Sequence, residues 1–329
     1  MSKIRLGIAG YGNVGRGVEI AIQQNDDMEL VAIFTRRNPN EIKTVTTGVK
    51  VYNIAEAEKH TDAIDVMLLC GGSATDLMEQ TPYFASHYNC VDSFDNHARI
   101  PEYFALVDEV AKKSKKVSII STGWDPGLFS LFRVLGMACL PNGCDYTFWG
   151  KGLSQGHSDA IRRVKGVKLA AQYTIPIESA VAEVRAGNNP TLTSRQKHIR
   201  ECFVVAEPNA DLNLIEQTIK IMPHYFSDYD TIIHFITEEE YQTKHTEMPH
   251  GGFVFRTGTT GKEHLHRQRM EFSLQLDSNP EFTASVMVAY ARAAYRLYLK
   301  GETGAKTVFD IPVGLLVSDT MDILRKNML

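Results

Sequence analysis

The amino-acid sequence predicts an α/β protein in which a parallel sheet, covered by helices on both faces, is followed by an α+β region with a mixed sheet. Up to about Ser121, short apolar runs alternate with segments of helical periodicity, which is typical of a doubly wound sheet. After about Pro126 the apolar runs are strand-like and this regular alternation stops. The length of 329 residues fits about two domains.

The first β-α-β unit can be followed along the chain. Residues 4–9 form a mostly apolar run that ends in glycines and suits a buried central strand. Val14, Val18 and Ile22 then share one face at helical spacing, and residues 30–34 form the second strand. The alternation continues with expected strands at 65–70, 89–93 and 117–121 and expected helices at 74–86 and 101–113.

The second part of the chain predicts a different arrangement. An apolar helix is expected at 128–140, and a strongly helical segment at 282–300 is expected to pack back onto the first domain. Between them, β-rich runs predict strands at 146–149, 202–205, 231–235 and 271–276. We therefore expect a first domain at 1–123, a second α+β domain at 124–281 and a C-terminal helical segment at 282–329.

Composition and charge exclude several classes of protein. Hydrophobic residues make up 43% of the chain and charged residues 22%, which is typical of a packed globular protein. With 35 Lys and Arg against 39 Asp and Glu, the net charge of −4 argues against a nucleic-acid partner. The apolar stretches are too short to cross a membrane, and the N-terminus leads directly into a strand pattern without a signal peptide. We expect a cytoplasmic protein.

The cysteines and histidines do not predict a metal site. The five cysteines are an odd number without a Cys-x-x-Cys pair, which argues against a disulfide framework and against a thiolate zinc site. His264 and His266 are two residues apart with only Glu263 as an acidic neighbour, a spacing that fits alternate positions of a strand or loop. We expect no metal.

A glycine motif follows the first expected strand and opens the first expected helix. Residues 10–15 fit the pattern G-x-G-x-x-G, in the context that gives this pattern meaning. The first glycine permits a tight turn, the second lets a pyrophosphate approach the backbone, and the third lets helix and strand pack closely. The motif predicts a Rossmann-type dinucleotide site made by Gly10, Tyr11, Gly12, Asn13, Val14 and Gly15.

The end of the second strand indicates which dinucleotide binds. NAD enzymes usually carry a carboxylate there for the ribose 2′-hydroxyl, whereas this chain has Thr35, Arg36 and Arg37. A hydroxyl and two guanidiniums can bind a 2′-phosphate by charge-assisted hydrogen bonds, so the expected cofactor is NADP. The alternative interpretation of these arginines is a solvated turn. After the next long strand, the segment expected to line the nicotinamide half consists of Cys70, Gly71, Gly72 and Ser73.

Two later strands also end in polar segments, at 91–97 and 121–127, and both should open onto the same crevice. Asp95 and Asp125 could bind a substrate ammonium and help it lose a proton, which prepares the amine-bearing carbon to release hydride. Alternatively, Asp125 is a helix N-cap ahead of Pro126, and Asp95 makes local turn bonds. The expected cofactor contacts from these segments are Ser93, Phe94, Asp95, Thr122, Gly123, Trp124, Asp125 and Pro126.

The run at 149–159, Trp-Gly-Lys-Gly-Leu-Ser-Gln-Gly-His-Ser-Asp, is richer in glycine and polar residues than an ordinary loop. Together with residues 10–15, 35–37, 121–127 and 248–252, it resembles the meso-diaminopimelate D-dehydrogenase family. The resemblance extends from Ile4 to beyond Phe282.

The resemblance implies NADP-dependent, reversible oxidative deamination of the D-centre of meso-2,6-diaminopimelate, in a homodimer whose second domain contributes substrate contacts and the dimer interface. It also implies which side chains hold the substrate. Those around the reacting D-amino-acid end would be Asp95, Asp125 and Trp149, with Gln155 and Gly156 in the same pocket. Those at the distal L-amino-acid end would be Thr174, Arg200, His250 and Asn279.

The chemistry of the substrate agrees with this division. A guanidinium such as that of Arg200 can bind a carboxylate bidentately, and recognition of both ends of the substrate selects one epimer. Without the family pattern, Arg200 would be interpreted as part of a surface charge run and His250 as a structural histidine. Two other functions remain open: a D-amino-acid dehydrogenase of broader specificity, and a non-catalytic NADP-binding sensor, since fold alone does not establish function.

Overall fold

The computed structural model describes residues 2–329 and divides the chain into two compact units. The first unit contains the residues up to Leu131 together with Pro280–Leu329, and the second unit is Phe132–Asn279. The chain therefore leaves the first unit within one helix and returns to it at the start of another. Within residues 2–329, no helix is long and apolar enough to cross a membrane.

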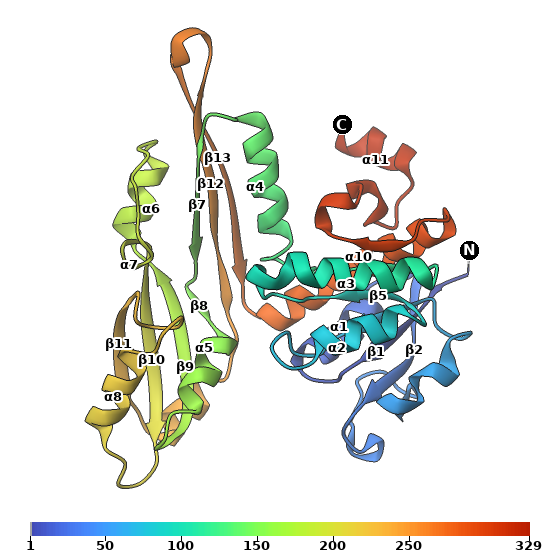
Figure 1. Cartoon of the computed structure of the whole chain (residues 1–329), viewed down its shortest axis with the longest axis horizontal. Coiled ribbons are helices and arrows are strands. Elements are labelled where there is room, and N and C mark those ends of the chain that lie inside the picture. Colours follow the sequence, from blue (N-terminus) through green and yellow to red (C-terminus); the bar gives the residue numbers. More distant parts are fainter. Residues whose placement is uncertain (1) are drawn as a thin grey trace. The chain divides into compact units, whose positions relative to one another are not determined.

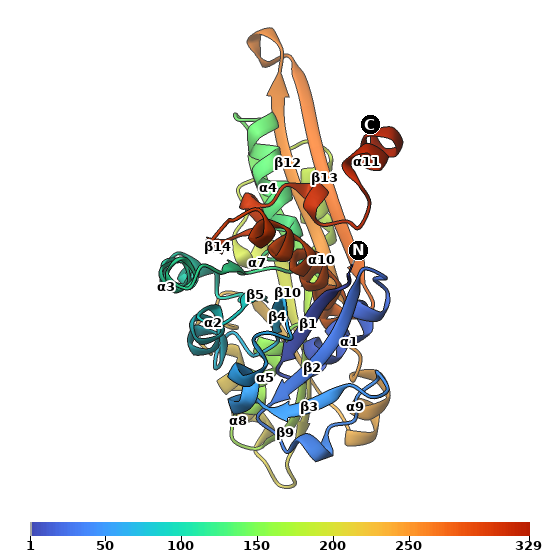
Figure 2. The ribbon, with the colours of Figure 1, turned by 90° about the vertical axis from the view of Figure 1, so that its right-hand side faces the viewer.

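The first unit is built on a seven-stranded sheet in the order β14-β6-β5-β4-β1-β2-β3, and every neighbouring pair of strands is parallel. Figure 2 shows β1, β2 and β3 side by side. The strands are β1 Ile4–Ala9, β2 Met28–Thr35, β3 Lys50–Asn53, β4 Val66–Leu69, β5 Asn89–Asp92, β6 Val117–Ile119 and β14 Gly304–Lys306. Because β1 lies between β2 and β4, the strand order reverses at β1 and a crevice forms at its carboxyl end.

Helices cover both faces of this sheet: α1 Asn13–Gln23, α2 Leu77–Ala85, α3 Ile100–Lys113 and α10 Asn279–Leu299. Alternate strand residues serve the two faces. Leu6 and Ile8 pack in one core with side chains of α1 and α10, and Met67 and Leu69 pack in a second core with side chains of α2 and α3. The predicted doubly wound α/β fold is confirmed.

The second unit contains two smaller sheets. One has the order β11-β10-β9-β8 and is mixed, because β10 is parallel to β11 and antiparallel to β9. The other has the order β13-β12-β7, and Figure 1 shows its β12–β13 hairpin running past the end of β7. The strands are β7 Cys144–Trp149, β8 Gly152–Leu153, β9 Val167–Pro176, β10 His198–Ala206, β11 Asp230–Phe235, β12 His250–Thr260 and β13 His266–Leu276. The mixed sheet was predicted and is confirmed.

The remaining helices are short, apart from α4 Leu128–Cys139, which contains the boundary between the units. The α-helices are α5 Gln155–Arg162, α6 Glu178–Arg185, α7 Ser194–Lys197, α8 Leu212–Lys220, α9 Glu238–Lys244 and α11 Met321–Met328. The 3-10 helices are η1 Pro39–Glu41, η2 Ile54–His60, η3 His97–Arg99, η4 Lys262–His264, η5 Val308–Asp310 and η6 Val313–Leu315.

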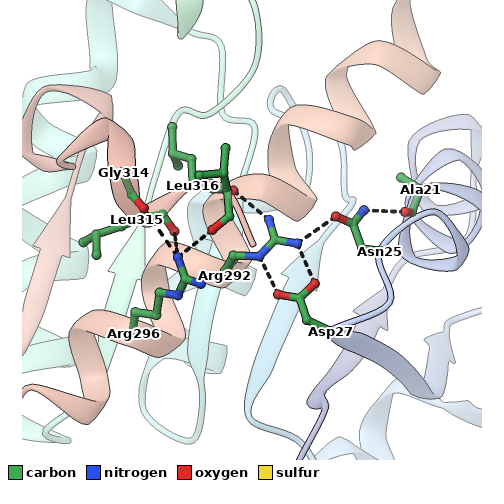
Figure 3. Close-up of polar contacts among 9 residues, drawn as sticks. Ala21, Asn25, Asp27, Arg292, Arg296, Gly314, Leu315 and Leu316 are labelled. Atoms are coloured by element: carbon green, nitrogen blue, oxygen red, sulfur yellow. Dashed lines mark hydrogen bonds and ion pairs between the residues drawn. The ribbon is translucent and has the colours of Figure 1, made fainter. Parts of the chain in front are cut away.

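Two arginines of α10 fasten the C-terminal segment to the first unit (Figure 3). Arg292 is buried and forms a two-pronged ion pair with Asp27, at 2.7 Å on both sides, while also donating to Leu316 O. Arg296 donates to the carbonyls of Leu315 and Val317. Hydrogen bonds from Arg292 hold the pKa of Asp27 below its usual value. The segment after η6 is therefore tied to the turn that precedes β2.

A buried carboxylate joins the ends of β5 and β6. Asp92 is fully buried, and its Oδ1 accepts hydrogen bonds from the N–H groups of Phe94 and Ser121 at 3.0 and 2.9 Å. Its Oδ2 accepts from the hydroxyls of Thr81 and Tyr103 at 3.0 and 2.5 Å. Burial raises the pKa of Asp92, while the four donors oppose that rise.

Asp92 also explains where β6 ends. The strand was predicted to continue to Ser121, but it stops at Ile119, because Ser121 adopts a φ of +57° to point its N–H at Asp92. Such a backbone costs of order 1–3 kcal/mol for a residue other than glycine and persists only where its surroundings hold it. The chain therefore leaves the sheet early at this strand.

We expect Tyr103→Phe to lower the free energy of unfolding of the protein by about 2 kcal/mol, because a buried carboxylate loses one of its four donors. Urea denaturation measures the change. Tyr83→Phe is the matched control, because the hydroxyl of Tyr83 donates to the exposed Glu58 and its loss should cost less than about 0.5 kcal/mol. Equal losses in the two variants would contradict a special role for the Asp92 cluster.

Candidate active site

The glycine loop has the geometry that a dinucleotide requires. Gly10 has a φ of +94°, which favours glycine, and its N–H donates to Phe34 O at 2.8 Å, so the loop is fastened to β2. Nothing lies within 4 Å of the position a Cβ would take on Gly12, which leaves its backbone open to a ligand. A Cβ on Gly15 would lie 2.2 Å from Gly10 O, so only glycine allows α1 to start this close to β1. A different physical constraint therefore favours glycine at each of these three positions.

The two arginines that follow β2 lie beside this loop. The buried Thr35 accepts a hydrogen bond from Arg37 N at 3.1 Å, and the Arg37 guanidinium donates to the carbonyl of Tyr11. Arg36 forms a two-pronged ion pair with Asp76, at 2.9 and 3.0 Å. Both guanidiniums therefore lie at the carboxyl end of the sheet, close to the residues expected to bind the cofactor.

The loops after β4 and β5 are joined at the same edge of the sheet. Cys70 N donates to Ala9 O at 2.8 Å, and Asp95 N donates to Ser73 Oγ at 3.1 Å. Burial raises the pKa of Cys70 to about 12, so its thiol stays protonated and is no nucleophile at neutral pH. Segments 70–73 and 93–95, predicted to lie together, are brought together.

The loop that follows β6 lies next to the loop after β5. Thr122 donates to Asp92 O through both its N–H, at 2.9 Å, and its hydroxyl, at 2.7 Å. A β-bridge between Trp124 and Gly127 then turns the chain so that Asp125 lies at the tip of the turn. Gly127 has a φ of +139° and α4 begins at Leu128, so Asp125 is not the N-cap of a helix that starts at Pro126.

Asp95 is exposed and Asp125 is half-buried, and both follow strands that are neighbours in the sheet. Their loops are also fastened to one residue, because Asp92 holds Phe94 N on one side and Ser121 N on the other. The first unit therefore presents two carboxylates, the glycine loop and two arginines at one edge. This edge has the components for binding a dinucleotide and for removing a proton from an ammonium group.

The second unit contributes a buried cation. Arg200 on β10 lies opposite Thr174 on β9, and its guanidinium donates to the Thr174 hydroxyl. The ring of Tyr229 lies 4.0 Å from Arg200 Cζ. Arg200 is only 6% exposed, its burial lowers its pKa, and its Nε has no hydrogen-bond partner among residues 2–329. A buried guanidinium with an unused donor calls for an acceptor, and a carboxylate is the best match.

Trp149, at the end of β7, is held from behind by His198. The backbone N–H of Trp149 donates to His198 Nε2 at 2.8 Å, and the two rings stack with centroids 5.4 Å apart. Burial, together with the nearby charges of Arg200 and Lys197, lowers the pKa of His198 to about 3, so its ring is neutral and can accept this bond. His198 is two residues from Arg200 on the same face of β10.

Two further predicted residues contact Met248, and a third, His250, packs against Gly152. Gln155 is the first residue of α5 and its amide donates to Met248 Sδ at 2.9 Å, while Asn279 N donates to Met248 O at 2.9 Å. His250 begins β12 and packs so closely over Gly152 that a Cβ there would lie 2.4 Å from its ring. Gly156 has open space beside its Cα. The structure therefore places the residues predicted for the substrate pocket, apart from the two aspartates, in the second unit.

Sequence reasoning missed Asp92, His198 and Tyr229. Each contacts a predicted residue or its loop. Asp92 lies within the polar segment 91–97 but was given no role, and neither His198 nor Tyr229 stands in a motif. The alternation of His198 and Arg200 along one strand was the single available signal for His198. In the part of the chain that the structure describes, no group of three or more His, Cys, Asp or Glu side chains could hold a metal ion.

Known proteins provide independent comparisons. A family model described as the diaminopimelic acid dehydrogenase C-terminal domain matches residues 123–278. A meso-diaminopimelate D-dehydrogenase of Ureibacillus thermosphaericus is 62% identical over 100% of both chains. One of Corynebacterium glutamicum is 46% identical over 98% of both chains, and one of Bacteroides fragilis is 31% identical over 95% of both.

Solved structures agree with these relatives. A mutant meso-diaminopimelate dehydrogenase of Clostridium tetani E88 with DAP is 56% identical with a TM-score of 0.94, over 99% of this chain and 100% of that one. The C. glutamicum DAP dehydrogenase in complex with DAP is 46% identical with a TM-score of 0.93, over 100% of both chains. An engineered D-amino acid dehydrogenase bound to NADP⁺ is 44% identical with a TM-score of 0.88, over 100% of both. The chain belongs to the meso-diaminopimelate D-dehydrogenase family.

Proposed function

We propose that this protein catalyses the NADP-dependent, reversible oxidative deamination of the D-centre of meso-2,6-diaminopimelate in lysine biosynthesis. The products are L-2-amino-6-oxopimelate, ammonia and NADPH, and one water is consumed. The observation that carries the proposal is the buried Arg200 with an unused Nε donor. A diaminopimelate has a second carboxylate to offer such a group, whereas a simple D-amino acid has none beyond the one next to its reacting carbon.

The residues at the carboxyl edge of the first sheet fit NADP. Gly12 leaves room for a pyrophosphate, and Arg36 and Arg37 stand where a 2′-phosphate would need cations. When bound, the nicotinamide supplies a hydride acceptor. The residues proposed to hold the cofactor are Gly10, Tyr11, Gly12, Asn13, Val14, Gly15, Thr35, Arg36, Arg37, Cys70, Gly71, Gly72, Ser73, Ser93, Phe94, Asp95, Thr122, Gly123, Trp124, Asp125 and Pro126.

Asp95 and Asp125 are proposed to act on the reacting amine. An ammonium group cannot lose hydride from its carbon until its nitrogen is deprotonated, and a carboxylate within hydrogen-bond reach can bind the ammonium and receive that proton. Trp149 is proposed to form a wall of the same pocket, and His198 keeps the tryptophan in place. Gln155 and Gly156 complete the D-amino-acid end.

Thr174, Arg200, His250 and Asn279 are proposed to hold the distal L-amino-acid end. Thr174 fixes the guanidinium of Arg200, and the Tyr229 ring supports it from one face, so the cation is preorganised for a carboxylate. Anchoring that end decides which of the two carbon centres is presented for oxidation, and therefore selects the D-centre.

We also propose that the protein is a homodimer and works in the cytoplasm. The side chains of Val134, Leu135 and Met137 on α4 are 46%, 57% and 52% exposed, whereas Phe132 of the same helix stacks on Phe272 of β13. Exposed apolar side chains grouped on one helix support an interface with a second copy. The five cysteines are free in the structure, which suits a reducing compartment.

Turnover of diaminopimelate isomers tests the reaction. We expect the purified protein to reduce NADP⁺ with the meso isomer and to be inactive with the LL isomer, which has no D-centre. NADPH absorbance measures the rate. Robust turnover of simple D-amino acids without turnover of the meso isomer would instead support the broader D-amino-acid dehydrogenase, for which the NADP⁺-bound engineered relative is a precedent.

Substitution of the distal anchor separates these two substrate classes. We expect Arg200→Met to raise the KM for meso-diaminopimelate about 10- to 100-fold, because one or two charge-assisted hydrogen bonds to the distal carboxylate are lost. The KM of a monocarboxylic D-amino acid should change little. Arg195→Met is the control, because Arg195 pairs with Asp230 on the surface. An equal rise for both substrates would show that Arg200 does not bind the distal carboxylate.

Substitution of the arginines after β2 tests the choice of cofactor. We expect Arg36→Ala with Arg37→Ala to raise the Kd of NADP at least about 10-fold and to leave the Kd of NAD nearly unchanged, because only NADP has a 2′-phosphate. Isothermal titration calorimetry measures both constants. Lys59→Ala, in η2 of the same unit, is the control cation. Parallel losses for NADP and NAD would contradict recognition of the 2′-phosphate by these residues.

A further inference from the structure

The ion pair between Arg36 and Asp76 spans the crevice of the first unit. Arg36 follows β2, whereas Asp76 follows β4, and β1 with its glycine loop lies between these two strands. Nη1 and Nη2 of Arg36 contact Oδ1 and Oδ2 of Asp76 at 2.9 and 3.0 Å. The carboxylate thus occupies the terminal edge of the guanidinium, the edge by which arginine binds a phosphate bidentately.

Asp76 is fixed in this position. Its side chain is only 11% exposed, whereas that of Arg36 is 66% exposed, and its Oδ2 also accepts a hydrogen bond from Gly72 N at 3.1 Å. Asp76 directly precedes the first residue of α2, a position where Asp commonly accepts a hydrogen bond from a helix N–H. Among the described residues, its side chain accepts no such bond from α2. Its carboxylate is therefore committed to Gly72 and Arg36.

We propose that Asp76 is a specificity-determining residue of the cofactor site. Its carboxylate competes with the 2′-phosphate for Arg36 and so reduces the preference of the protein for NADP over NAD. This inference rests on the proposed role of Arg36 in binding NADP. A phosphate that approaches Arg36 has to displace the carboxylate from the guanidinium, and the hydrogen bond from Gly72 N helps to hold the carboxylate where it is. NAD lacks the phosphate, so its binding requires no such exchange.

Asp76→Asn keeps an acceptor for Gly72 N and removes the negative charge. We expect this substitution to lower the Kd of NADP about 5- to 10-fold, because the phosphate no longer has to displace a charged carboxylate from the Arg36 guanidinium, and to change the Kd of NAD less than about 2-fold. The adenosine fragment 2′,5′-ADP should follow NADP, because it carries the same phosphate. Isothermal titration calorimetry with the full chain gives the three constants.

Asp65→Asn is the matched control. Asp65 forms an equivalent two-pronged pair with Arg5, at 3.2 and 2.8 Å, but at the amino ends of β1 and β4. Its substitution should leave the Kd of NADP unchanged. Circular dichroism melting of both variants establishes that each is folded at the temperature of the titration.

A second background separates this inference from the proposed function. In Arg36→Ala, addition of Asp76→Asn should improve NADP binding by less than about 2-fold, because the contested guanidinium is gone. Unchanged or weaker NADP binding by Asp76→Asn, while Arg36→Ala still weakens it, would overturn the competition by Asp76 and leave the cofactor assignment intact. If Arg36→Ala has no effect on NADP binding, the assignment of Arg36 to the 2′-phosphate fails as well.

Discussion

The arrangement of the first unit depends on the buried carboxylate of Asp92. Four donors converge on it, from the loop after β5, α2, α3 and the loop after β6, and its own carbonyl accepts hydrogen bonds from Thr122. The bonds to Phe94, Ser121 and Thr122 fix the loops that follow β5 and β6, and those to Thr81 and Tyr103 join these loops to α2 and α3. A buried charge is stable only when its hydrogen bonds are complete, so the loops that carry Asp95 and Asp125 cannot move independently without leaving this carboxylate underbonded.

The second unit, in contrast, buries a cation, the guanidinium of Arg200. The antiparallel register of β9 and β10 sets Thr174 opposite Arg200, and Tyr229 covers the cation. His157 and His198 both lie near Arg200, and burial together with its charge lowers the pKa of each to about 3. Both histidines near Arg200 are therefore neutral and add no positive charge beside it. The first unit thus carries exposed and half-buried carboxylates, whereas the second unit carries a buried guanidinium.

Much of the fold could be predicted because it follows local patterns. The buried parallel strands and the glycine loop depend on apolar runs and on glycines whose roles are set by neighbouring backbone, as at Gly15. The strand β14 is only three residues long and lies far from its partner β6 in the chain, so no local pattern predicted it. Ser121 shows the same limit, since its backbone is decided by Asp92 rather than by its own propensity.

The residues of the candidate site fall into the same two groups, those that belong to local patterns and those that do not. Residues in motifs, such as Gly10, Arg36 and Asp125, could be predicted from the residue types that the chemistry demands. His198, Tyr229 and Asp76 could not, because their contacts join segments distant in sequence, and a single histidine, tyrosine or aspartate has no distinguishing pattern.

The completion of the first unit by its C-terminal segment has a consequence for synthesis on the ribosome. The face of the sheet that packs against α10 carries Leu6, Ile8 and Leu68, and α10 and β14 are translated only after the whole second unit. The N-terminal half therefore emerges with an apolar face that only α1 covers and with an unpaired β6 edge, a state in which nascent chains aggregate or recruit chaperones. The ion pair between Arg292 and Asp27 cannot form until residue 292 has been made, and it joins segments synthesised early and late in translation.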